Sequence, residues 1–161
     1  RTEGVRIVLL DRGYRHDVAA TSPWLLAGAK TLSYAVNRAA QREAARRGAD
    51  DLVFVSSDGY LLEGAVSSLL VRVGDRLVTP RIDLGILAGT TQADLFSWAE
   101  SAGYTTGFEL LTPADLRSAD AAWLVSSVRH VAPIRSVDGD PLTIDADLTA
   151  RLNNALESRT H

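Results

Sequence analysis

DLVFVSSDGYLLEGAVSSLLVRVGDRLVTP, residues 51–80, is the stretch that decides the fold of this 161-residue chain. Its apolar runs are short and contain many β-branched and aromatic residues, which is typical of strands. Asp58-Gly59 and Gly74-Asp75 are favourable turn sequences between neighbouring runs. Two consecutive hairpins predict an antiparallel meander. We expect its strands at residues 51–56, 60–63, 68–73 and 76–80.

Strand and helix patterns alternate on both sides of this stretch. Upstream, an apolar run at 5–10 predicts a buried strand, and the polar segment 11–22 predicts a loop. Apolar residues at helical spacing predict helices over about 31–47 and 91–102. The remaining expected elements are strands at 104–111, 122–126 and 131–137, a short helix from 113 and a helix over 145–158. Mixed strands and helices around one core predict an α/β (α+β mixed) fold over residues 1–161.

Composition excludes several classes of function. Apolar residues make up 46% and charged residues 23%, and the formal net charge is −3. The chain therefore lacks the basic excess of a nucleic-acid binder, and no apolar run is long enough to cross a bilayer. It has no cysteine, so neither a disulfide framework nor a thiolate site is possible. We expect a cytoplasmic protein that binds neither nucleic acid nor membrane.

The chain contains no methionine and opens on Arg1-Thr2-Glu3-Gly4. We therefore expect it to belong to a longer protein whose N-terminal portion is missing from this sequence.

The single lysine, Lys30, lies in the mostly apolar stretch 23–34, whereas the other basic residues of the chain are all arginine. Lysine is the basic side chain that can lose its proton and act as a nucleophile. Apolar surroundings favour the neutral amine, which Schiff-base chemistry requires. The alternative is a surface lysine at the start of a helix whose charged end reaches solvent.

Three further features have both a functional and an ordinary interpretation. The glycine-threonine segment 85–91 precedes a helix, where it either offers backbone N–H groups to a phosphate or forms an ordinary capped helix start. Glu63 ends an apolar strand, so its carboxylate is either partly buried and in need of a cation or exposed to water. Ser126-Ser127 offers hydroxyl donors to a ligand or forms a turn. Together with a desolvated amine, these are the parts of a pyridoxal phosphate site.

The order and spacing of these motifs resemble the C-terminal half of the fold-type IV pyridoxal-phosphate enzymes. This family includes the branched-chain and D-amino-acid aminotransferases and aminodeoxychorismate lyase. The resemblance runs from about Pro23 to Leu142. The segments that carry it are AKTLSY at 29–34, DGYLLEG at 58–64, LVTP at 77–80, LAGTT at 87–91, SS at 126–127 and PIRSVDG at 133–139.

The resemblance implies a role for each residue. Lys30 would bind the cofactor aldehyde as a Schiff base and later move the substrate proton. Glu63 would pair with the pyridinium nitrogen. The backbone N–H groups of Thr90 and Thr91 would hold the phosphate of pyridoxal 5'-phosphate, helped by Ser127.

Further implications concern Tyr34 and the rest of the fold. Tyr34 would lie near the ring oxygen of the cofactor. The fold would be the C-terminal large domain of the D-amino-acid aminotransferase-like enzymes, in which mixed, largely antiparallel strands form a pseudo-barrel flanked by helices. The sequence departs from the family at Gln92, where an arginine is usual, and near Ser68, where an asparagine is frequent. The N-terminal substrate domain of the family has no counterpart here.

The resemblance is strongest to aminodeoxychorismate lyase, which converts 4-amino-4-deoxychorismate to 4-aminobenzoate and pyruvate for folate synthesis. The alternative within the family is an aminotransferase acting on branched-chain or D-amino acids. A hypothesis of another class is a non-catalytic fragment that binds no cofactor. Members of the family are homodimers that act on small molecules, so the resemblance also implies a homodimer.

Overall fold

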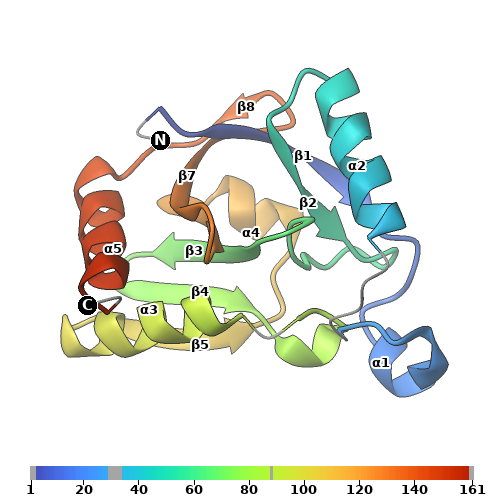
Figure 1. The fold of residues 1–161 in the computed structure, drawn as a ribbon, viewed down its shortest axis with the longest axis horizontal. Coiled ribbons are helices and arrows are strands. Elements are labelled where there is room, and N and C mark those ends of the chain that lie inside the picture. The colour runs from blue at the N-terminus through green and yellow to red at the C-terminus, as the bar shows by residue number, and fades with distance from the viewer. Residues whose placement is uncertain (1–2, 29–33, 88, 160–161) are drawn as a thin grey trace.

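A mixed β-sheet forms the centre of the molecule (Figure 1). The structure is a computed structural model that describes residues 3–28, 34–87 and 89–159. Within these residues the strands lie in the order β2-β1-β7-β6-β3-β4-β5, with β8 paired to β7. The strands are β1 (Val5–Asp11), β2 (Asp51–Val55), β3 (Ser68–Val73), β4 (Arg76–Pro80), β5 (Thr105–Glu109), β6 (Ala121–Ser126), β7 (His130–Val137) and β8 (Asp140–Pro141).

Parallel and antiparallel pairings are combined in this sheet. β1 runs parallel to both β2 and β7, and β4 runs parallel to β5. The pairings β3–β4, β3–β6, β6–β7 and β7–β8 are antiparallel. Together with its flanking helices, this mixed sheet confirms the fold class predicted from the sequence.

The predicted antiparallel meander over 51–80 is wrong. β3 and β4 do form the expected hairpin, but β2 pairs with β1 instead of joining them. The expected return strand at 60–63 does turn back on β2, with a bridge between Leu61 and Val55 and backbone hydrogen bonds that join 54 to 62–63 and 56 to 60. On its other side, the backbone N–H of Leu61 donates to the carbonyl of Leu111, which lies far along the chain. Within the described residues this segment therefore lies between β2 and Leu111, and β3 pairs with β4 and β6 instead.

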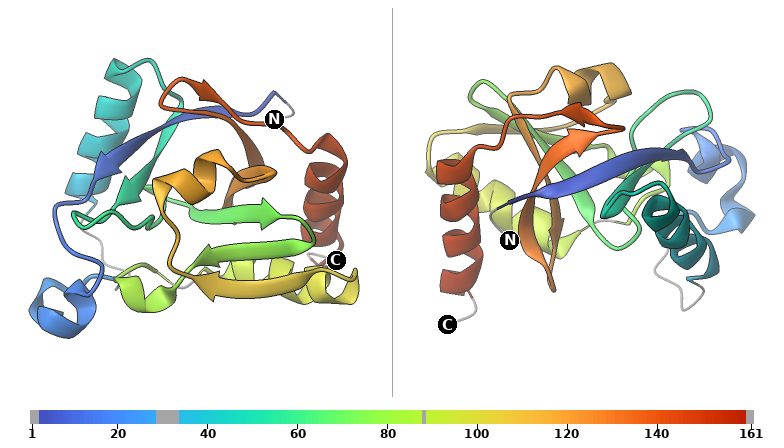
Figure 2. Two further views of the ribbon diagram at one scale, coloured as in Figure 1. Left: turned by 180° about the vertical axis from the view of Figure 1, so that it is seen from behind. Right: turned by 90° about the horizontal axis from the view of Figure 1, so that it is seen from above.

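The helices cover the sheet from opposite ends (Figure 2). α2 (Ala35–Arg46) lies beside β1 and β2, whereas α5 (Ala146–Arg159) packs against β7 and against α3 (Thr90–Ser101). The short helices are α1 (Val18–Thr21), α4 (Pro113–Arg117) and the 3-10 turns η1 (Pro23–Leu25) and η2 (Ile82–Leu84). α1 interrupts the segment 11–22 that we expected to be loop, and η1 follows directly after that segment. No helix in the described residues is long and apolar enough to cross a membrane.

Alternating residues of the central strands bury their side chains on opposite faces of the sheet. In β6, Ala122 and Leu124 belong to one apolar cluster, whereas Trp123 belongs to the cluster beneath α3 and α5. Trp123 is fully buried, and its indole Nε1 donates to Oγ1 of Thr149 in α5 at 2.8 Å. This hydrogen bond satisfies the indole N–H and fixes α5 on the sheet.

We predict that the Trp123–Thr149 hydrogen bond stabilises the domain. Thr149→Val leaves the buried indole N–H without an acceptor, which should lower the free energy of unfolding by about 1–3 kcal/mol. In a Trp123→Phe background the same substitution should cost about 1 kcal/mol less, because the donor is already gone. Urea denaturation of the four proteins measures this difference, and simple additivity of the two costs would contradict the prediction.

Candidate active site

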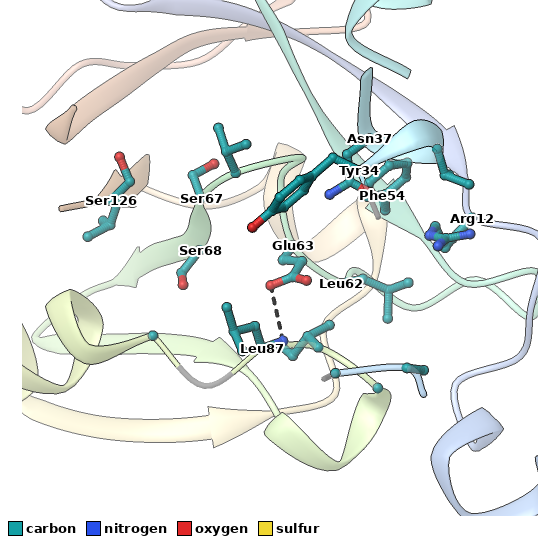
Figure 3. Close-up of a pocket in the computed structure, with 18 of the residues that line it drawn as sticks. Arg12, Tyr34, Asn37, Phe54, Leu62, Glu63, Ser67, Ser68, Leu87 and Ser126 are labelled. Carbon is teal, nitrogen blue, oxygen red and sulfur yellow. Dashed lines mark hydrogen bonds between the residues drawn. The ribbon is translucent and has the colours of Figure 1, made fainter. Parts of the chain in front are cut away.

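A pocket of about 840 Å³ opens where β1, β2 and β6 end and α2 and α3 begin. Its wall is built from segments distant in sequence, as Figure 3 shows. The lining residues are 12, 14, 25–28, 34, 36–37, 54, 62–63, 66–68, 85–87, 89–91 and 125–127. A site assembled in this way at element ends is the usual setting for a ligand.

The pocket brings together most of the residues predicted from the sequence. Tyr34, Glu63, Thr90, Thr91 and Ser127 all line it. Their individual roles toward a cofactor stay predictions.

Lys30 and Thr31 lie outside the described residues. The nearest described residues on each side, Gly28 and Tyr34, both line the pocket. The side chain of Tyr34 reaches toward Glu63 (Figure 3).

Glu63 has a carboxyl group that is largely shielded from water. Its Oε2 accepts a hydrogen bond of 3.3 Å from the backbone N–H of Leu87 (Figure 3). Within the described residues Glu63 forms no ion pair. Burial raises the pKa of Glu63 to about 7, against the opposing effects of the Leu87 N–H and of Arg12. A ligand N–H placed here would give the carboxylate the partner that it lacks.

Arg12 is the cation that lies toward Glu63. Its guanidinium lies 4.9 Å from the ring centre of Tyr14 and 5.5 Å from that of Phe54. These aromatic contacts hold the side chain at the pocket wall. Arg12 was not predicted from the sequence, because residues 11–22 have the composition of an ordinary polar loop. An arginine directly after a buried strand was the available signal.

The start of α3 offers uncapped backbone donors. Gly89 is the N-cap residue, and no side chain caps the helix. A Cβ atom at Gly89 would lie 2.6 Å from Oγ of Ser68, so the absence of a side chain lets this hydroxyl approach the helix start. N–H groups at a helix start, with the helix dipole, bind anions. Thr90 and Thr91 therefore begin a helix whose first N–H groups lie at the pocket wall.

Hydroxyl groups complete this side of the pocket. Oγ of Ser126 accepts from the backbone N–H of Arg129 at 3.0 Å, so Ser126 forms the turn after β6. Its neighbour Ser127 also lines the pocket. Oγ of Ser67, another lining residue, and Nε2 of Gln92 are both buried, and neither has a hydrogen-bond partner among the described residues. Such orphaned polar atoms are rare in native proteins and indicate a missing ligand or water.

The apolar residues before Lys30 are largely exposed: the values for Trp24, Leu25 and Leu26 are 73%, 56% and 61%. Lys30 itself lies outside the described residues, so its desolvation stays a prediction. Leu25 and Leu26 lie at the pocket wall and face solvent. Apolar sequence did not imply burial here because no described part of the chain covers this segment.

A pair of polar residues fixes the segment between β1 and α1. The backbone N–H of His16 donates to Oδ1 of Asp58 at 2.9 Å, and the His16 ring hydrogen-bonds to the other carboxylate oxygen. The ring also meets that of Tyr60 edge-on, with centres 5.0 Å apart. The turn after β2 therefore holds the segment that continues toward the pocket.

Comparisons with known proteins agree on one family. Residues 5–137 match the family model described as amino-transferase class IV. The bifunctional aminodeoxychorismate lyase / D-amino acid transaminase of Mycobacterium tuberculosis is 44% identical, over 96% of this chain and 57% of the relative.

Solved structures give the same result. A fold IV-transaminase from Curtobacterium pusillum is similar with a TM-score of 0.95 and 60% identity, over 99% of this chain and 53% of that one. The PLP-bound form of a hypothetical aminotransferase from Mycobacterium tuberculosis is similar with a TM-score of 0.92 and 43% identity, over 99% and 56%. The chain thus spans about half the length of these relatives.

We predict that Glu63 makes the stability of the cofactor-free protein depend on pH. Its carboxyl keeps a proton in the folded state up to about pH 7, whereas the unfolded chain releases that proton at about 4.5. The contribution is therefore present below about pH 4.5 and is lost as the pH rises through about 7. Relative to Glu63→Gln, the wild-type free energy of unfolding should fall by about 3 kcal/mol across this window.

Urea denaturation of the complete protein between about pH 5 and 8 measures this difference. Glu43→Gln is the control, because Arg46 and Arg47 lower the pKa of Glu43 to about 2 and it stays ionised throughout. Parallel pH curves for wild type and Glu63→Gln would show that Glu63 is ionised in the folded protein.

Proposed function

Because this chain belongs to the class IV amino-transferase family, we propose that it carries the cofactor site of a pyridoxal-phosphate-dependent enzyme. The observation that carries the proposal is the pocket in which Glu63, Thr90, Thr91 and Ser127 meet. A related structure at 43% identity is a PLP-bound form, which supports the choice of cofactor. Residues 1–161 would be the cofactor-binding domain.

The residues of the pocket fit this cofactor. Glu63 lacks an ion-pair partner among the described residues, and its carboxylate would accept the N–H of a protonated pyridine. The uncapped start of α3 would bind the phosphate through the N–H groups of Thr90 and Thr91, with the Ser127 hydroxyl as a further donor. When bound, pyridoxal phosphate supplies a ring that withdraws electrons from the reacting carbon of the substrate.

Each residue would then have a distinct task. Lys30 would attach the cofactor covalently through its amine and, once released, move a proton at the substrate carbon. Glu63 in its ionised form would keep the proton on the ring nitrogen. Tyr34, which reaches toward Glu63, would contact the cofactor ring from the start of α2 (Figure 3). Arg12 would favour the charged form of Glu63 and so assist this pairing.

Two reactions of the family remain candidates. We favour the lyase, which releases pyruvate from 4-amino-4-deoxychorismate and leaves 4-aminobenzoate for folate synthesis. The 44% identical relative is named for both lyase and D-amino acid transaminase activity. An aminotransferase of D-amino or branched-chain amino acids is the second candidate, supported by the 60% identity to a fold IV-transaminase.

The assembly is part of the same proposal. We infer a homodimer, supported by the exposed apolar side chains of Trp24, Leu25, Leu26 and Val66, three of which line the pocket. A cytoplasmic location fits the cysteine-free sequence.

We predict that Lys30 of the complete protein becomes covalently attached to pyridoxal phosphate. Borohydride reduction followed by peptide mass spectrometry should find the modification on Lys30, and Lys30→Arg should abolish it while keeping the positive charge. A protein that takes up no cofactor would support the non-catalytic alternative and would contradict the proposed enzyme.

We predict that the loaded protein releases pyruvate from 4-amino-4-deoxychorismate without any keto acid. A panel of D-amino and branched-chain amino acids, each offered with and without a keto acid, is the comparison. Turnover that depends on a keto acid, with no pyruvate from the chorismate, would establish the aminotransferase instead.

A further inference from the structure

Two loops of the pocket approach each other so closely that there is no room for a side chain at Gly28 on one loop or at Gly85 on the other. A Cβ atom on Gly28 would lie 2.9 Å from the carbonyl oxygen of Ile86 and 3.3 Å from the carbonyl carbon of Gly85. A Cβ atom on Gly85 would lie 2.9 Å from Cβ of Ala27 and 3.0 Å from Cγ1 of Val18. Non-bonded carbon atoms prefer about 3.5–4.0 Å, so either addition would push the loops apart.

The backbone of both residues also requires glycine. Gly28 has φ 85° and Gly85 has φ 75°, which is the left-handed region. The atoms opposite Gly28 belong to the backbone of residues 85 and 86, so no side-chain rotation could make room. We refer to the close approach of Ala27-Gly28 to Gly85-Ile86 as the glycine contact.

The glycine contact lies between the segment that leads to Lys30 and the segment that leads from Ile86 into α3. Gly28 comes two residues before Lys30 in the sequence. On the other side, Ile86 is followed by Leu87, whose N–H donates to Glu63 at 3.3 Å (Figure 3). The same segment continues through Gly89 into α3, where Thr90 and Thr91 line the pocket. The glycine contact therefore joins the segment before Lys30 to the segment that contacts Glu63 and begins α3.

We propose that Gly28 and Gly85 are positioning residues that hold residues 23–28, the segment that leads to Lys30, against the Glu63–α3 side of the cofactor site. The proposal rests on the proposed function, because it assumes that Lys30 and α3 hold the same ligand. Attachment through Lys30 and binding of the phosphate at α3 require a fixed spacing. Displacing reacting groups by about 1 Å is enough to lower reactivity strongly.

Gly13 provides a matched control for backbone strain. Its φ is 91°, in the same left-handed region, but nothing lies within 4 Å of a Cβ atom added there. Gly13→Ala therefore imposes the conformational cost of an alanine without separating two loops. Any effect specific to Gly28→Ala reports the glycine contact and not strain alone.

The experiment compares two ligands on the complete, cofactor-free protein. Pyridoxal 5'-phosphate has the aldehyde that Lys30 attaches, whereas pyridoxine 5'-phosphate has an alcohol there and binds only through ring and phosphate contacts. Dissociation constants are measured for both ligands by calorimetry. The dissociation constant of pyridoxine 5'-phosphate divided by that of pyridoxal 5'-phosphate is the ratio that reports the aldehyde-dependent part of the affinity. Thermal unfolding of each apo variant reports stability separately.

We expect Gly28→Ala to lower this ratio about tenfold or more while the affinity for pyridoxine 5'-phosphate changes little. Gly13→Ala should keep the wild-type ratio even if it unfolds at a lower temperature. Ala27→Gly combined with Val18→Ala should restore the ratio in a Gly85→Ala background, because the two changes remove both side-chain carbons that the new Cβ atom would meet. If Gly28→Ala does not fold, this rescue decides the matter.

Three outcomes would overturn the proposal. Gly28→Ala keeps the wild-type ratio, or it weakens both ligands equally as a purely structural defect would, or Ala27→Gly with Val18→Ala fails to rescue Gly85→Ala. A wild-type protein that binds both phosphates with the same affinity gives a different result. It would contradict the proposed function itself, because Lys30 would not attach the aldehyde.

Discussion

The parallel pairing of β1 with both β2 and β7 is the constraint on which the rest of the structure depends. Ile7, almost completely buried, is paired with Asp51 on one side and with Val137 on the other. This arrangement joins segments from the start, the middle and the later part of the chain in one sheet. It also brings the ends of β1 and β2 to the same place, since parallel strands end at the same edge. The segment that leads to Lys30 therefore leaves the sheet beside the segment that leads to Glu63.

The electrostatics of the pocket follow from this placement. Glu63 is shielded from water by residues of several elements, and Arg12 at the end of β1 only partly offsets the cost of its charge. The Leu87 N–H comes from a third segment. A carboxyl group with a pKa near 7 is ready to change its ionisation when a cationic ligand group arrives. Its pairing with a protonated pyridine would thus convert a destabilising burial into a specific interaction.

Particular residues show how far the sequence can be interpreted. Local patterns predicted β3, β4, β6 and β7 because alternating apolar residues and turn signals suffice for strands. They predicted the turn of 60–63 back onto β2 but not its other neighbour, the distant Leu111, nor the pairing of β3 with β6. They also missed α1 and the exposure of Trp24, since covering a segment depends on what else packs there. Motif order located Glu63, Thr90, Thr91 and Ser127, whereas Arg12 had no motif to mark it.

The sequence by itself determined the chemical groups: a single lysine, a carboxylate after an apolar run, and glycine and threonine before a helix. These are properties of residue type and local order, so no fold is needed to find them. Only the tertiary structure decided that the carboxylate, the helix start and the serine turn meet in one pocket, and that Glu63 is desolvated there. The tertiary structure alone decided that the loops of Gly28 and Gly85 approach too closely for a side chain at either position. Desolvation and close approach depend on atoms brought together from distant parts of the chain, which no local sequence pattern specifies.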